Sequence, residues 1–135
     1  MVCDFDTDWC GFSKSVDYKW VRGANATETE DTGPSGDHTS GRGYYLYIDA
    51  TSPNNPYRGP FIIQKNLDEH MNKVEFYYFM YGIHVGTLDF DVSSSGADWT
   101  TIWSKSGEQG NEWFLATVSL PVSSKTFPFP YSITK

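Results

Sequence analysis

Residues Leu88 to Val92 read LDFDV, with apolar and acidic side chains in strict alternation. Because successive side chains of a strand point to opposite faces, this pattern predicts a β-strand whose apolar residues lie in a core. Asp89 and Asp91 are expected on the other face, where they form an ordinary polar surface. The segment therefore predicts a sheet with one buried and one solvated face.

Short segments of the same kind occur on both sides of it. Alternating or continuous apolar patterns predict further strands at 16–21, 44–48, 59–63, 74–80, 100–103 and 114–120. Turn residues such as Pro53-Asn54-Asn55-Pro56 separate the strands, and the one predicted helical turn spans 66–71. Neither a repeat nor a long linker divides the chain. This spacing predicts an all-β fold, an antiparallel two-sheet β-sandwich that forms a single domain over residues 1–135.

Composition limits the classes of partner. A chain of 135 residues is long enough for one domain with a real core, and an aromatic content of 17% favours strands. The net charge of -7, with scattered Lys and Arg, argues against nucleic acid and anionic membranes as partners. No apolar run approaches the roughly 20 residues of a spanning helix, so we expect no direct membrane insertion. The N-terminus is too polar for a signal peptide, and Met1 is expected to be an expression start at the edge of a domain.

Two features bear on the cellular compartment. Cys3 and Cys10 are the chain's two cysteines, and with no histidine at ligand spacing they do not make a zinc site. A disulfide closing a small loop is the favoured interpretation, and two packed free thiols in a reducing compartment are the alternative. Asn25-Ala26-Thr27 is an N-glycosylation sequon in a polar loop, which agrees with a secreted protein.

Several short motifs of the sequence match those of a known family, and they occur in the same order. They are Cys3-Asp4-Phe5-Asp6, Cys10-Gly11-Phe12, Tyr18-Lys19-Trp20, Thr32-Gly33-Pro34, Gly36-Asp37-His38-Thr39, Phe76-Tyr77-Tyr78-Phe79-Met80-Tyr81-Gly82, Val85-Gly86-Thr87-Leu88 and Ile102-Trp103-Ser104. In these motifs the chain resembles a MAM domain, a family named for meprin, neuropilin and a receptor-type tyrosine phosphatase. The resemblance covers nearly the whole chain and implies a noncatalytic, extracellular jelly-roll sandwich. It also implies a role in adhesion or assembly at cell surfaces, through another protein or a second copy of the chain.

The chain departs from the family pattern near its end. Lys73 stands where the family has a third cysteine, and the fourth cysteine is missing too. A final strand with an acidic word is not found before Lys135, so we expect the last strand of the domain to be missing. The tail at 127–131 contains prolines, which lack the donor that a central strand needs. An unpaired edge is therefore expected, open to self-association or to a strand from a partner.

The glycine-rich loop GPSGDHTSGRG at 33–43 carries the candidate site residues Asp37 and His38. Catalysis is not favoured, because adjacent side chains on an extended chain point apart and no catalytic motif accompanies them. Oxygen ligands suit Ca²⁺, and the resemblance places Asp37 and Asp6 where some MAM domains hold a calcium or sodium ion. The alternative is a structural turn in which Asp37 caps backbone amides. His38 is expected to pack beside Trp20.

The many aromatic residues leave a second function class open. Sugar-binding modules of this architecture stack glycans on exposed rings, for which the chain offers Trp9, Tyr57, Trp99 and Trp113. The opposing interpretation places most of these rings in the core. A glycoside hydrolase would need two carboxylates about 5 to 10 Å apart across a cleft, and no such pair is evident. The sequence thus predicts an adhesion or assembly module, with a carbohydrate-binding module as the alternative.

Overall fold

The regular structure of the chain is entirely β. The computed structural model describes residues 1–14, 20–27, 29–48, 61–68, 70–121 and 130–134, and every regular element within them is a strand. The strands are β1 (Ser13–Lys14), β2 (Trp20–Ala24), β3 (Tyr44–Ile48), β4 (Ile62–Asn66), β5 (Lys73–Tyr78), β6 (Thr87–Val92), β7 (Thr100–Ser106), β8 (Phe114–Ser119) and β9 (Pro130–Thr134). In these ranges no helix has the length and apolarity to cross a membrane. The predicted all-β fold class is confirmed.

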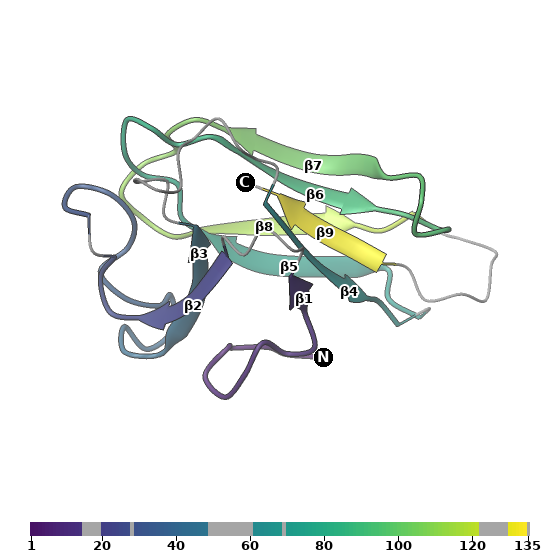
Figure 1. Cartoon of the computed structure of the whole chain (residues 1–135), viewed down its shortest axis with the longest axis horizontal. Coiled ribbons are helices and arrows are strands. Elements are labelled where there is room, and N and C mark those ends of the chain that lie inside the picture. Colours follow the sequence, from purple (N-terminus) through teal and green to yellow (C-terminus); the bar gives the residue numbers. More distant parts are fainter. Residues whose placement is uncertain (15–19, 28, 49–60, 69, 122–129, 135) are drawn as a thin grey trace.

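The strands form one large sheet and two smaller pairs. The large sheet has five strands in the order β1-β4-β9-β6-β7, and each neighbouring pair is antiparallel. β2 pairs with β3 and β5 with β8, also antiparallel. Figure 1 shows β5 and β8 behind the five-stranded sheet, with the β2–β3 pair at one end of the molecule. The arrangement is a sandwich of antiparallel layers.

A single apolar core lies between these layers. The buried side chains of its first cluster are Trp20, Ile48, Phe61, Ile63, Tyr78, Met80, Leu88 and Ala116. Those of its second cluster are Leu67, Phe90, Val92 and Val118. Phe76 and Trp103 pack against both clusters and join them. Leu88, Phe90 and Val92 are all buried, as the alternation of LDFDV predicts.

Most predicted strands are present, and two are displaced. The predictions at 44–48, 74–80, 88–92, 100–103 and 114–120 correspond to β3, β5, β6, β7 and β8. Those at 16–21 and 59–63 correspond to β2 and β4, which extend further toward the C-terminus; residues 16–19 and 59–60 lie outside the described ranges.

The helical turn predicted at 66–71 is not what the structure shows. Asn66 ends β4, and a single backbone hydrogen bond from Met71 N to Asp68 O, at 3.0 Å, closes a turn. The Asp68 carboxylate accepts a further bond from the His70 amide at 2.9 Å. An aspartate that caps an amide two residues on favours a turn over a continuing helix.

The end of the chain takes part in the large sheet. β9 pairs with β4 on one side and β6 on the other, for example Ile133 opposite Ile63 and Phe90. The expectation that the tail leaves a neighbouring edge unpaired is therefore wrong for these two strands. A proline is tolerated as the first residue of a strand, which is where Pro130 stands in β9. Residues 127–129 lie outside the described ranges, and the absence of a final family strand stays a prediction.

Candidate functional site

The Asp37 loop, residues 33–43, is organised around one carboxylate. Asp37 Oδ2 accepts the amides of Thr39 at 2.9 Å and Ser40 at 3.0 Å. Its Oδ1 accepts the Ser40 hydroxyl and the Gly43 amide, both at 2.8 Å. The Ser40 amide above all, and the other three donors with it, hold the pKa of Asp37 well below its usual range against a smaller opposing effect of burial. Asp37 therefore caps the turn, as one of the two sequence interpretations predicts.

The loop also contacts the rest of the domain through Gly36 and Trp113. The Trp113 indole N–H donates to Gly36 O at 3.2 Å. Gly36 is buried, and a Cβ on it would lie 2.4 Å from Gly41 O, so the two loop backbones approach closely where only glycine fits. Trp113 makes edge contacts with Tyr45 and Phe79, at ring centroid distances of 5.9 and 5.4 Å. The tip of the loop is thus held against a cluster of aromatic rings.

A second carboxylate reaches the loop from the N-terminus. Cys3 and Cys10 form a disulfide, and Asp6, within the segment it closes, accepts the Tyr44 amide at 2.7 Å. Arg22 on β2 donates to the carbonyls of Phe5 and Asp6, each at 2.5 Å, which fixes this segment against the β2–β3 pair.

Asp6 and Asp37 converge on Gly43. A Cβ on Gly43 would lie 2.6 Å from Asp6 Oδ1 and 3.2 Å from Asp37 Cγ. The described residues contain no group of three or more His, Cys, Asp or Glu side chains that would hold a metal ion. Calcium takes six to eight oxygens, and all four hydrogen bonds of Asp37 would compete with it. The donor set fits a capped turn better than a cation, and cation binding stays a prediction.

Cation binding at Asp6 and Asp37 is tested by thermal unfolding. An ion that binds only the native state stabilises it, so calcium or sodium would raise the melting temperature above the value measured in chelator and low salt. The increase would be smaller in Asp6→Asn, which weakens one ligand. Superimposable melting curves of the wild type in calcium, sodium and chelator would refute the predicted cation site.

Replacing Asp37 with asparagine is expected to change stability most near neutral pH. The folded pKa lies below the unfolded value of about 3.9, so the contribution of Asp37 is fully present above that value. It is lost as the pH falls toward the folded pKa. We expect Asp37→Asn to lower the free energy of unfolding by about 1 to 2 kcal/mol at pH 7 and by less at pH 2 to 3. Melting temperatures from pH 2 to 7 measure this, with Asp98→Asn in the exposed β6–β7 turn as control.

His38 lies beside Tyr77, and the expected contact with Trp20 is wrong. The His38 and Tyr77 rings stack with centroids 3.3 Å apart and planes 11° apart, and Trp113 meets His38 edge-on at 6.4 Å. Trp20 is buried, and its indole N–H donates to Phe61 O at 2.8 Å. The ring of Trp20 is thus turned into the core, while His38 remains on the surface.

An exposed apolar pair extends this contact. Tyr77 on β5 is directly opposite Leu115 on β8, and their side chains are 46% and 53% exposed. We call His38, Tyr77 and Leu115 the Tyr77 surface. The sequence holds a signal for it, because Leu115 has the parity opposite to the buried Ala116 and Val118. An aliphatic residue on the solvent face of a strand is the feature that the sequence interpretation passed over.

The polar face of β6 is as predicted. Asp89 and Asp91 are half-buried and accept the hydroxyls of Ser104 and Thr101, each at 2.5 Å. These neighbours come from β7, so the carboxylates form cross-strand pairs of the kind that stabilises a sheet. Nothing in this arrangement marks a catalytic pair.

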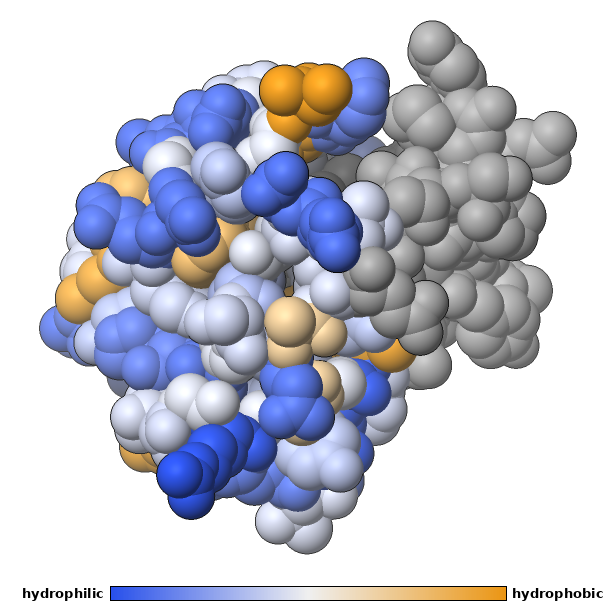
Figure 2. All heavy atoms as spheres, turned by 90° about the vertical axis from the view of Figure 1, so that its left-hand side faces the viewer, coloured by the Kyte–Doolittle hydropathy of each residue, from blue (hydrophilic) through white to orange (hydrophobic). Residues whose placement is uncertain are grey.

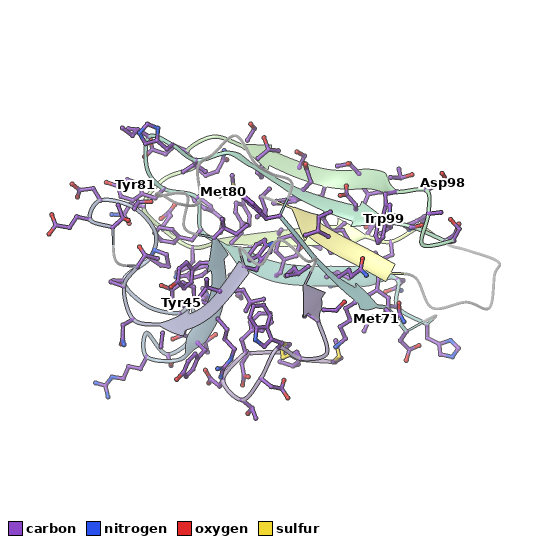
Figure 3. All side chains as sticks on the ribbon, in the orientation of Figure 1. Tyr45, Met71, Met80, Tyr81, Asp98 and Trp99 are labelled. Atoms are coloured by element: carbon purple, nitrogen blue, oxygen red, sulfur yellow. A yellow bond between two sulfur atoms is a disulfide. The ribbon has the colours of Figure 1, made fainter. Side chains whose placement is uncertain are left out.

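The aromatic residues considered for sugar stacking do not form one platform. Figure 3 shows Trp99 at the end of the sandwich opposite to Tyr45, and Trp113 contacts Tyr45. Trp9 is partly buried against the core, and Tyr57 lies outside the described ranges. A glycan-binding role stays a prediction, which a glycan array comparing the wild type with Trp99→Ala would test.

Comparison with known proteins settles the family. Residues 3–131 match the family model described as MAM domain, meprin/A5/mu. The chain belongs to the MAM family. A MAM domain is a jelly-roll β-sandwich, which fits the layers seen here, and the Cys3–Cys10 disulfide agrees with the extracellular location of this family.

Named relatives agree with this assignment. The MAM domain is 32% identical over 93% of its length to Neuropilin-1a of Danio rerio. It is 37% identical over 84% to Thyroid hormone-induced protein B of Xenopus laevis, and 34% identical over 86% to MAM domain-containing protein 2 of Mus musculus. It spans only 15%, 17% and 18% of the lengths of these three relatives.

Proposed function

We propose that this MAM domain is a noncatalytic adhesion or assembly module that binds another protein through the Tyr77 surface. MAM domains are extracellular and mediate protein–protein interactions, and the matching family model supports that role here. The observation that carries the proposal is the exposed pair Tyr77 and Leu115 on neighbouring strands.

The chemistry of the Tyr77 surface suits a protein partner. Tyrosine supplies a large contact area with few rotatable bonds, and the stacked His38 ring limits the movement of Tyr77 further. An ion pair between Lys73 and Glu75, at 3.0 Å and about half exposed, lies on the same face and provides a polar rim. A rigid aromatic centre with a polar rim is typical of binding energy concentrated in a few residues.

The proposed partners are a second copy of the chain and proteins on cell surfaces. Both are tested with one double variant, Tyr77→Ala with Leu115→Ser, which removes the apolar pair and keeps the core. The control is Ile83→Ser, since Ile83 is 89% exposed in the β5–β6 loop and equally apolar. Beads coated with the domain report self-association, and binding of the multimerised domain to intact cells reports other partners.

We expect the double variant to lose at least tenfold in bead clustering or in cell binding, as loss of an interface centre worth about 1.4 kcal/mol or more requires. The Ile83→Ser variant should behave as the wild type. An unchanged melting temperature would show that the double variant is folded. Clustering and cell binding that both equal the wild-type values would refute the proposed surface.

A further inference from the structure

The triplet Asn25-Ala26-Thr27 is the only Asn-x-Ser/Thr sequence of the chain, and the structure places it in a turn. It follows directly after β2, at the start of the long connection to β3. Asn25 has a φ of 64°, in the left-handed region that asparagine tolerates better than most residues. Figure 1 shows this connection extending beyond the β2–β3 pair at one end of the molecule.

The backbone of Asn25 is held while its side chain is accessible. The buried Tyr45 donates its hydroxyl to Asn25 O at 2.6 Å, which fixes the position of the turn. Asn25 and Ala26 are both exposed, and no hydrogen bond joins the Asn25 side-chain amide to another described residue. A substituent on this amide nitrogen therefore displaces no packed group within the described part of the chain.

Thr27 is engaged in the folded turn. Its hydroxyl donates to Thr32 O at 2.7 Å, and a Cβ on Gly33 would lie 2.7 Å from the Thr27 Oγ1 atom. The threonine of the triplet is thus packed against the loop, whereas the asparagine points to solvent. This geometry suits attachment of a sugar before the loop closes, followed by folding with the sugar outside.

We propose that Asn25 is an N-glycosylation site, an inference that rests on the extracellular location in the proposed function. The donor class is an oligosaccharide linked to a polyprenyl diphosphate. The Asn25 amide nitrogen forms a bond to C1 of the first sugar, and the bond between C1 and the diphosphate oxygen breaks. The diphosphate leaves with the electron pair, and the amide proton passes to a base of the transferase. Figure 2 shows this end of the molecule as a mainly hydrophilic surface with separate apolar patches, which agrees with a glycan in solvent.

The experiment uses the full chain, directed through a eukaryotic secretory pathway, and intact-mass measurement. Asn25→Asp removes the acceptor with a residue that also tolerates positive φ, and Thr27→Ser keeps both the triplet and the hydroxyl. We expect one discrete oligosaccharide mass on the wild type and on Thr27→Ser, and none on Asn25→Asp. An amidase that releases the whole glycan by hydrolysing the side-chain amide should reduce the first two to their polypeptide masses with aspartate in place of Asn25.

Secreted wild type with the Cys3–Cys10 disulfide and an unmodified mass would overturn the proposal, as would an oligosaccharide that persists in Asn25→Asp. The Tyr77 and Leu115 double variant separates the two proposals. It should carry the same glycan mass as the wild type while losing adhesion, so a failure of adhesion leaves the glycan result unaffected.

Discussion

Phe90→Ala is expected to lower the free energy of unfolding by about 3 to 5 kcal/mol. Phe90 is 0% exposed and stacks on Phe76 with ring centroids 5.8 Å apart. Removing the ring leaves a cavity among Leu67, Val92 and Val118, which come from separate segments and cannot all move inward. Since small domains are stable by about 5 to 15 kcal/mol, the variant loses a large part of its stability.

Denaturant unfolding followed by tryptophan fluorescence measures this loss. The matched control is Leu115→Ala, which shortens a side chain that is 53% exposed and should change stability by about 0.5 kcal/mol or less. Equal unfolding midpoints for the two variants would contradict the assignment of Phe90 to the centre of the core.

The second large effect is expected at Gly36. In Gly36→Ala the new methyl group would lie 2.4 Å from Gly41 O, a backbone atom that cannot rotate away. The loop must open, which strains the Asp37 turn and the hydrogen bond from Trp113 to Gly36 O. We expect a loss of about 1 to 3 kcal/mol, the usual cost of inserting a methyl group into a packed site.

The control for Gly36→Ala is Gly86→Ala, where a Cβ would meet nothing within 4 Å. We expect that variant to stay within about 1 kcal/mol of the wild type. Melting temperatures compare the two, and tryptophan fluorescence, to which Trp113 contributes as one of five tryptophans, reports whether the loop has moved. If Gly36→Ala has the same melting temperature as Gly86→Ala and the same fluorescence as the wild type, the close approach of the two loop backbones is wrong.

The sequence predicted those parts of the fold that depend on alternation within one segment. The alternation of LDFDV correctly predicts that Phe90 is buried, because the buried face of a strand can be identified from the positions of its own apolar residues. β1 is not predicted from the sequence, because Ser13–Lys14 is too short to show an alternating pattern. β9 is not predicted, because the prolines of the tail at 127–131 argue against a central strand along its whole length. Pro130 occupies the first position of β9, where a missing amide is tolerated.

In the candidate site, too, the features that depend on nearby residues are predictable from the sequence, and those that depend on distant residues are not. The capping role of Asp37 follows from its neighbours in sequence, with Thr39, Ser40 and Gly43 close enough to donate. The stack of His38 on Tyr77 depends instead on how the loop crosses a sheet formed much later in the chain. No local pattern encodes that crossing, so the expected partner of His38 was wrong.

The position of β9 bears on how the protein is made. β4 and β6 lie in the same sheet, yet each of them pairs with β9, which follows both of them in sequence and is the most C-terminal of the described strands. On the ribosome, β6 and β7 can pair early, but β4 has to wait for Pro130–Thr134 before it joins them. Contacts between such distant segments slow folding and expose strands to other nascent chains. Completion of the large sheet is therefore expected late in folding, and a chain that ends before β9 would leave β4 and β6 without the strand that joins them.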